Sequence, residues 1–283
     1  MRVFVIGATG FIGGTVANRL MSAGHVITGL ARSADAAETL ESQGIEPVAG
    51  NLTDHRSVEA AVQSAEATVW IAGGVDGAIE PSGVAAALPT DDACFLFTSG
   101  AAAYPDTGNE PVDESTPLAS EATTNRENSV LGAPRGRNIV IRPTLVYGPG
   151  GDGGAGVRAL IEPAREHGVS YYSSDVDCQL STVHVHDLAD LYLLAFQDAP
   201  SGTLINASAE PPLTGKRLAE AVAQAAGVPG KTEAIPSDQV IERLGPLGRL
   251  YTKNMVISSE RARTLLGWSP RGESLPEVLK GWS

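Results

Sequence analysis

Residues 2–14 read RVFVIGATGFIGG, and this stretch decides the fold. The apolar run at 2–6 predicts a buried parallel strand, and the helical spacing of apolar residues after the turn predicts a helix. Between them stand Gly7, Gly10 and Gly13. Glycines at this spacing allow a tight turn, the close approach of an anion to the backbone, and tight packing of helix on strand. Free N–H groups at the helix start would then face a phosphate, so the stretch predicts a nucleotide-binding unit.

Strands and helices alternate along the first 145 residues. The predicted strands span 2–6, 26–30, 45–48, 68–72, 94–98 and 138–142. The predicted helices between them include 12–21, 34–43 and 54–65. This alternation implies right-handed crossovers between parallel strands. We therefore expect an α/β fold of the Rossmann type, a doubly wound parallel sheet with helices on both faces.

The alternation loosens after Tyr147. Residues 148–154 (GPGGDGG) predict a loop. Further along, we expect helices near 155–167, 187–197 and 214–226, a strand at 203–206, and short helices and loops over 228–275. Residues 1–150 are then a dinucleotide-binding domain whose sheet is completed by later segments at about 180–207. Residues 151–283 are mainly a smaller, discontinuous substrate-binding lobe.

Composition limits the class of protein. The chain of 283 residues carries 20 Lys and Arg against 33 Asp and Glu, a formal net charge of −13. This acidic balance argues against a nucleic-acid partner and against docking on anionic membranes. Cys94 and Cys178 cannot build a disulfide framework, and no apolar run approaches the ~18 residues of a membrane span. We expect a cytoplasmic monomer or homodimer that binds a small-molecule substrate.

Further motifs follow the glycine turn in a specific order. They are NLTD at 51–54, TSGAAAY at 98–104, RPTLVYGPG at 142–150, TVHVHDLAD at 182–190, INASAEPPLT at 205–214 and LLGWSP at 265–270. With GATGFIGG at 7–14, this order resembles the short-chain dehydrogenase/reductase superfamily, in its extended or atypical, epimerase/dehydratase-like form. The resemblance covers nearly the whole chain. It implies a pyridine dinucleotide held by Gly7, Thr9, Gly10, Phe11, Ile12, Gly13, Asn51, Leu52, Ala72, Gly73, Thr98, Pro143 and Val146.

The end of the second predicted strand bears on which dinucleotide is bound. An acidic residue there would accept hydrogen bonds from the ribose diol, whereas an arginine favours a 2′-phosphate. This chain has Arg32 and Ser33 at that point and no carboxylate. We predict NADP in preference to NAD; the alternative is that Arg32 is an ordinary solvated side chain.

The resemblance also implies a catalytic serine or threonine followed by Tyr-x-x-x-Lys. Ser99 matches the serine, but the sequence contains no Tyr-x-x-x-Lys. Ala119 and Thr123 stand where the tyrosine and lysine are expected. The four lysines all lie far downstream, at Lys216, Lys231, Lys253 and Lys280.

Another acid is therefore needed for proton transfer. Tyr104 follows Ser99 closely, on a loop that could lie above the nicotinamide, and Tyr147 belongs to the stretch that lines the cleft in the family. We take Ser99, Tyr104 and Tyr147 as catalytic candidates, with packing as the alternative role of both tyrosines. An unassisted phenol has a pKa near ~10, which makes it a poor base but still a hydrogen-bond donor.

Two clusters are assigned no chemistry. His184 and His186 alternate along an expected strand, but no third ligand accompanies them, so we expect no metal site. The acidic residues at 106–121 are expected to be solvated on a surface loop; the alternative is that they receive a cationic substrate.

The sequence thus predicts an NAD(P)-dependent oxidoreductase. The expected reaction is NADP(H)-dependent reduction of a carbonyl or activated double bond in a small organic molecule, because the cofactor carries the difficult chemistry. The alternatives are an epimerase or dehydratase that uses the cofactor transiently, and a redox sensor or scaffold that binds NADP(H) without turnover.

Overall fold

The structure is a computed structural model that describes residues 1–73, 76–149 and 157–282. Most of the loop predicted at 148–154 lies outside the described residues, as do the first two residues of the helix predicted at 155–167.

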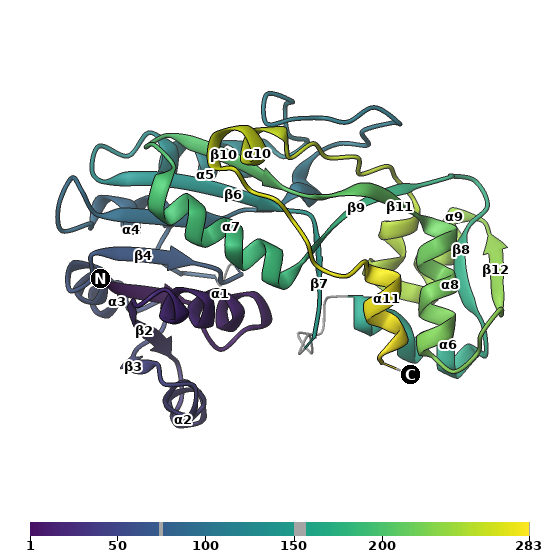
Figure 1. Cartoon of the computed structure of the whole chain (residues 1–283), viewed down its shortest axis with the longest axis horizontal. Helices are drawn as coiled ribbons and strands as arrows, with labels where there is room; N and C mark the ends of the chain where they lie inside the picture. The colour runs from purple at the N-terminus through teal and green to yellow at the C-terminus, as the bar shows by residue number, and fades with distance from the viewer. Residues whose placement is uncertain (74–75, 150–156, 283) are drawn as a thin grey trace.

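Seven parallel strands form the central sheet (Figure 1). Their order across the sheet is β10-β6-β5-β4-β1-β2-β3. The bounds are β1 Arg2–Ile6, β2 Val26–Ala31, β3 Glu46–Ala49, β4 Ala67–Trp70, β5 Cys94–Thr98, β6 Arg137–Pro143 and β10 Thr203–Ala207. The strand order reverses its direction of growth between β1 and β4, which opens a crevice at their carboxyl ends. The predicted doubly wound parallel sheet is confirmed.

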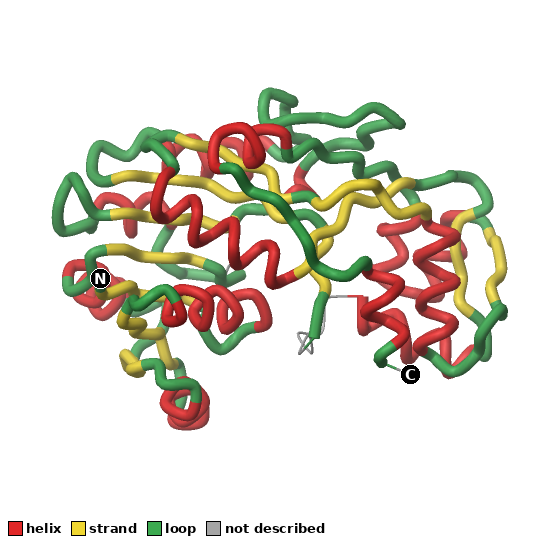
Figure 2. Tube along the Cα trace, in the orientation of Figure 1, coloured by secondary structure: helices red, strands yellow, loops and turns green. Residues whose placement is uncertain are grey.

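Helices cover both faces of this sheet (Figure 2). One face packs against α1 Phe11–Ser22, α2 Ala34–Ser42, α7 Val185–Asp198 and α10 Glu260–Leu266. The other packs against α3 His55–Gln63, α4 Pro81–Ala86 and α5 Glu121–Leu131. The sequence pattern does not predict helices at the positions of α4 and α5. In α5 (EATTNRENSVL) too few residues are apolar to show helical periodicity, so its packing depends on tertiary contacts.

A smaller part follows with a hydrophobic core of its own. It contains a three-stranded sheet of β7 Leu145–Tyr147, β9 Gln179–His184 and β11 Ala209–Thr214, and a parallel pair of β8 Ser170–Ser173 and β12 Thr232–Ile235. Its helices are η2 Val157–Leu160, α6 Ile161–His167, α8 Gly215–Ala225, α9 Ser237–Leu244, η3 Gly245–Tyr251 and α11 Leu275–Lys280. Strand β12 corrects the expectation of only helices and loops over 228–275; this strand is short and mostly solvent-facing, so its sequence signal is weak.

The chain returns to the central sheet after entering the smaller part. Helix α7 packs against α1, strand β10 forms the edge of the sheet beside β6, and α10 packs against both α7 and β10. No helix among the described residues is long and apolar enough to cross a bilayer.

The turn between β1 and α1 requires glycine at two positions. Gly7 has φ +96°, in the left-handed region that favours glycine. A Cβ on Gly13 would lie 1.9 Å from the carbonyl oxygen of Gly7, so only glycine lets α1 approach the turn this closely.

We predict that Gly13→Ala lowers the free energy of unfolding by about 1–3 kcal/mol, because the new methyl group must push α1 away from the turn. Urea denaturation measures the effect. Asn18→Ala, on an exposed position of the same helix, is the control and should change stability by less than about 0.5 kcal/mol. Equal stabilities of the two variants would contradict the contact.

Candidate active site

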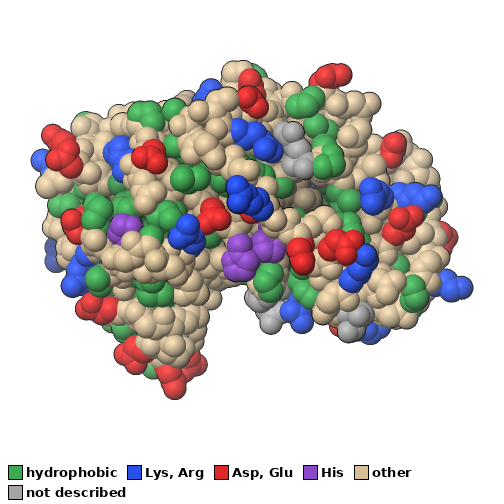
Figure 3. Space-filling view, in the orientation of Figure 1, with side chains coloured by type: hydrophobic (Ala, Val, Ile, Leu, Met, Phe, Trp, Pro, Cys, Tyr) green, Lys and Arg blue, Asp and Glu red, His purple; other side chains and the backbone are tan. Residues whose placement is uncertain are grey.

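A cavity of about 950 Å³ lies between the carboxyl ends of the central strands and the smaller part. The turn at Gly10–Gly13 and Ile71, after β4, line one side. The loop after β5, strand β7, and the segments around η2 and η3 line the rest. Figure 3 shows the surface notched between the two parts of the molecule. The cavity therefore occupies the crevice where open α/β sheets bind ligands.

The N-terminus of α1 faces this cavity with its amides uncapped. Gly10 is the N-cap residue, with extended backbone (φ −86°, ψ 166°) and no side-chain cap. No acidic side chain stands in the first turn. The amides of a first helical turn have no partner within the helix and carry the positive end of its dipole. Gly10, Phe11, Ile12 and Gly13 line the cavity, while Thr9 is exposed at the tip of the turn.

The adenosine end was predicted at Arg32, Ser33, Asn51 and Leu52. Arg32 is exposed at the end of β2, and it forms no ion pair within the described part of the chain. Ser33 caps α2 by accepting a hydrogen bond from the amide of Ala36 at 3.2 Å. A free guanidinium beside a helix N-terminus suits a phosphate.

Asn51 and Leu52 have structural roles. The Asn51 side-chain oxygen accepts from the amides of Thr53 (2.8 Å) and Asp54 (3.1 Å), which closes the turn before α3. Leu52 is buried in the core beneath α3. Among the described residues the side-chain nitrogen of Asn51 has no hydrogen-bond partner, which leaves it for an adenine. Ala72 and Gly73 follow Ile71 directly, and the Ala72 carbonyl accepts from the Trp70 indole at 2.9 Å.

Ser99 lies at the carboxyl end of β5. Its side chain is half-buried, and its amide donates to the carbonyl of Ile141 at 2.9 Å. The residues after it, Gly100 and Ala102, line the cavity. Thr98 before it points the other way, because its hydroxyl lies 2.5 Å from the Tyr192 hydroxyl on α7. Pro143 and Val146, after β6 and on β7, line the cavity directly.

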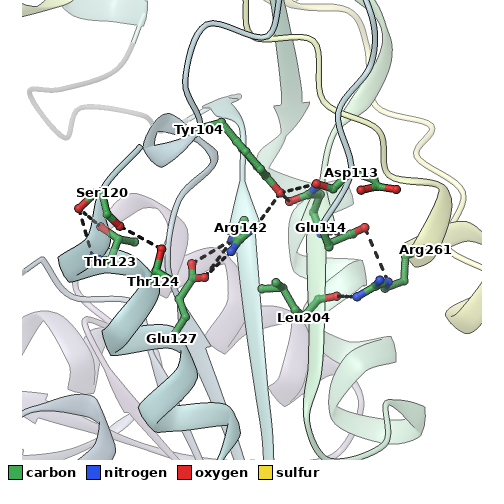
Figure 4. A network of polar contacts seen from close by, with 11 residues as sticks. Tyr104, Asp113, Glu114, Ser120, Thr123, Thr124, Glu127, Arg142, Leu204 and Arg261 are labelled. Atoms are coloured by element: carbon green, nitrogen blue, oxygen red, sulfur yellow. Dashed lines mark hydrogen bonds and ion pairs between the residues drawn. The ribbon is translucent and has the colours of Figure 1, made fainter. Parts of the chain in front are cut away.

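Tyr104 lies in a buried polar network instead of on the cavity wall (Figure 4). Its side chain is fully buried, and its hydroxyl accepts from Arg142 Nη1 at 2.6 Å. The Asp113 carbonyl (3.0 Å) and Asn206 Oδ1 (3.1 Å) stand within donating distance of the same hydroxyl. Burial raises the pKa of Tyr104. The structure thus does not place this phenol above a nicotinamide, where the sequence analysis expected it.

The centre of the network is the ion pair between Arg142 and Glu127, both buried. Arg142 Nε donates to Glu127 Oε1 at 2.9 Å, and its Nη2 donates to Oε2. This pair fastens α5 to β6. Glu114 extends the network by accepting from the Asn206 amide at 2.7 Å and pairing with Arg261 at 3.7 Å. Glu114 corrects the expectation that the acidic segment at 106–121 is solvated, since its side chain is only 3% exposed.

Tyr147 lines the cavity, but its hydroxyl is already bonded. It donates to the carbonyl of Glu273 at 2.8 Å, and its ring packs edge-on against His184, with 5.4 Å between centroids. Burial raises the pKa of Tyr147 to about 12. This phenol therefore stays protonated at neutral pH and cannot serve there as a base.

His184 and His186 do not alternate along one strand. His184 ends β9 and is the N-cap of α7, where its Nδ1 accepts from the amide of His186 at 3.2 Å. Asp187 in the next position accepts from the amides of Arg271 (2.8 Å) and Gly272 (2.9 Å). The motif therefore holds the C-terminal segment against α7. Over the described ranges, no group of three or more His, Cys, Asp or Glu is arranged to hold a metal.

Residues 3–208 match the NAD dependent epimerase/dehydratase family. The chain belongs to this family. An uncharacterized protein from Saccharomyces cerevisiae is 28% identical over 99% of this chain and 98% of its own length. A UDP-glucose 4-epimerase from Mycolicibacterium smegmatis is 28% identical over 96% of this chain and 94% of its own length. A human epimerase family protein solved with NADPH superimposes with a TM-score of 0.73 at 21% identity, over 99% of this chain and 98% of its own.

Membership of the epimerase/dehydratase family confirms the predictions of an NAD(P)-dependent enzyme and of a pyridine nucleotide cofactor. The residues present fit such a group, because Gly13 allows the helix to approach the turn and the uncapped amides face the cavity.

Three cationic side chains line the cavity that were not predicted as site residues from the sequence. They are Arg158, Arg249 and Lys253. They lie in η2, in η3 and in the segment after η3, where irregular backbone leaves no periodic signal. Around them the wall is mostly apolar, with Leu145, Leu180, Leu247, Leu250, Met255 and Trp282.

We predict that Glu127→Ala lowers the free energy of unfolding by about 3–5 kcal/mol, because Arg142 is left buried without its partner. Glu162→Ala removes the exposed partner of Arg165 and should cost less than about 1 kcal/mol. Urea denaturation compares the two. If Glu127→Ala does not fold, Glu127→Gln retains the shape and should still lower the denaturation midpoint. A midpoint equal to that of the parent would rule out a structural role for the pair.

Proposed function

We propose that the protein is an NADP(H)-dependent reductase acting on a carbonyl or an activated double bond of a small organic molecule. The observation that carries the proposal is a single cavity with uncapped helix amides at one end and an apolar wall at the other. The amides suit the diphosphate of a dinucleotide, and the apolar wall suits the body of a second molecule. When bound, the reduced cofactor would supply the hydride.

The preference for NADP rests on Arg32. Its guanidinium stands exposed at the end of β2, at the position where an arginine accommodates the 2′-phosphate. The same fold is found in a human protein solved with NADPH and in proteins solved with NAD, so the fold itself does not decide between the two cofactors.

We assign the nucleotide to residues 1–150, together with α7 and β10 on the same sheet. We assign substrate binding to the remainder of 151–283, because the segments around η2 and η3 contribute the wall opposite the glycine turn. Leu247, Leu250 and Trp282 on this wall favour a substrate with an apolar body.

Reduction is favoured over epimerisation because neither candidate tyrosine can act as a base. An epimerase that oxidises its substrate transiently must remove a hydroxyl proton, and this step requires a base. Tyr104 is fully buried and Tyr147 has a pKa of about 12, so neither phenol meets this need near neutrality. Reduction requires only a donor to the developing oxyanion. Ser99, half-buried at the cavity edge, is proposed to hold that oxygen.

The test is oxidation of NADPH in the presence of a panel of ketones, aldehydes and enones. We expect turnover with at least one apolar member, and a loss of at least tenfold in kcat for Ser99→Ala with NADPH affinity unchanged. Ser129→Ala, exposed on α5, is the control and should match the parent. Tight NADPH binding without turnover on any compound would instead favour the redox sensor or scaffold.

A second prediction concerns cofactor choice. Arg32→Ala should weaken NADPH binding about tenfold or more and leave NADH binding unchanged, because only the 2′-phosphate loses a charge-assisted hydrogen bond. Isothermal titration calorimetry measures both affinities. Arg217→Ala, an exposed arginine on α8, controls for net charge. Equal losses for NADPH and NADH would count against the assignment.

A further inference from the structure

Lys253 is the cation on the cavity wall that lies against the loop after β5. We propose that Lys253 is the catalytic acid, which binds the oxygen of the substrate carbonyl and donates its proton to it. This inference rests on the proposed reductase function and names the donor that the missing Tyr-x-x-x-Lys leaves open. No spacing in the sequence connects Lys253 to Ser99, since more than half the chain separates them.

Hydrogen bonds of the two residues after Lys253 hold its segment in place. The next residue, Asn254, accepts from the amide of Thr107 at 3.1 Å, which ties the segment to the loop after β5. The Asn254 side-chain oxygen accepts from the amide of Gln179 at 2.8 Å, and the amide of Met255 donates to the Gln179 carbonyl at 2.7 Å. The segment is thus clamped between this loop and β9. A side chain on such a support is held in place before a substrate arrives.

The ammonium group has two neutral partners. Lys253 Nζ donates to the carbonyls of Tyr104 (3.1 Å) and Ala102 (3.3 Å), and Ala102 itself lines the cavity. An ammonium has three N–H donors, so one is left for a ligand. Carbonyl partners do not cancel the positive charge as a carboxylate would. Lys253 also forms no ion pair with any residue that the structure describes.

The environment makes this group a stronger acid than an ordinary lysine. Partial burial lowers the pKa of Lys253, and the nearby Asp106 carboxylate opposes the shift. A lowered pKa brings an acid closer to the operating pH, which assists proton donation. Arg158 and Arg249 share the cavity wall, but a guanidinium does not lose its proton in proteins. Neither guanidinium can therefore replace Lys253 as the proton donor.

In the proposed reduction the substrate carbonyl receives a hydride from the reduced cofactor and a proton from Lys253. The bound cofactor would supply a hydride to the carbonyl carbon, and the electron pair of the C=O π bond would move to the oxygen. One N–H bond of Lys253 breaks as an O–H bond forms on that oxygen, giving the alcohol. The neutral amine then takes a proton from solvent, so each cycle consumes one NADPH, one proton and one carbonyl.

The first experiment compares Lys253→Met, Lys253→Arg and the control Lys231→Met, which removes an exposed lysine of the smaller part. We expect Lys253→Met to lower kcat at least a hundredfold with the Kd for NADPH changed less than threefold. Lys253→Arg should keep substrate KM near the parent value but recover less than a tenth of kcat, because it retains charge and donors without a transferable proton. Turnover by Lys253→Met within threefold of the parent would overturn the inference while leaving the reductase proposal intact.

The second experiment does not depend on turnover. Trace acylation with acetic anhydride, read by mass spectrometry, compares the reactivity of the four lysines with and without saturating NADPH. We expect bound NADPH to slow acylation of Lys253 at least fivefold and to change Lys216, Lys231 and Lys280 less than twofold. Equal acylation of Lys253 in both states places it away from the reacting atoms and overturns the inference. Absence of NADPH binding in calorimetry would instead overturn the proposed function itself.

Discussion

The close contact between Gly13 and the carbonyl of Gly7 controls the cofactor end of the molecule. Because a Cβ on Gly13 would meet that carbonyl at 1.9 Å, helix α1 can start against the turn only when this position is glycine. The consequence is electrostatic as well as steric. The first-turn amides of α1 are left uncapped at the edge of the sheet, where they meet the cavity. The rest of the proposed site is arranged around the ligand that these amides would hold.

A second constraint acts beneath the cavity wall, between β6 and α5. The buried pair of Arg142 and Glu127 joins β6 to α5, and Tyr104 joins the same network through its hydroxyl. Charged groups in this setting are tolerated because each is paired and hydrogen-bonded. The network fixes the loop that follows Ser99, and the carbonyls of that loop in turn hold Lys253. Tyr104, a catalytic candidate in the sequence, therefore serves to position the cavity wall.

The sequence predicted the local units well and the contacts between distant units poorly. Strand β5 spans the predicted residues 94–98, because a buried parallel strand is a continuous apolar run bounded by polar residues. Helix α5 has no such pattern and is held through its Glu127, which pairs with Arg142 of β6 fifteen residues further along the chain. Tyr104 was predicted to be catalytic because it follows Ser99 closely in the sequence. That closeness does not reveal that the Tyr104 hydroxyl accepts a hydrogen bond from Arg142 in the core.

The sequence by itself determined the α/β alternation and the glycine turn with its open helix start, since each depends on spacing within a short stretch. It also indicated the family, through the order of short motifs along the chain. Tertiary structure alone decided which polar groups line the cavity. It buried Tyr104, bonded the hydroxyl of Tyr147 to Glu273, and brought Lys253 from the C-terminal third to the loop after β5. The physical reason is that these outcomes depend on hydrogen bonds between residues far apart in the chain, which local periodicity does not encode.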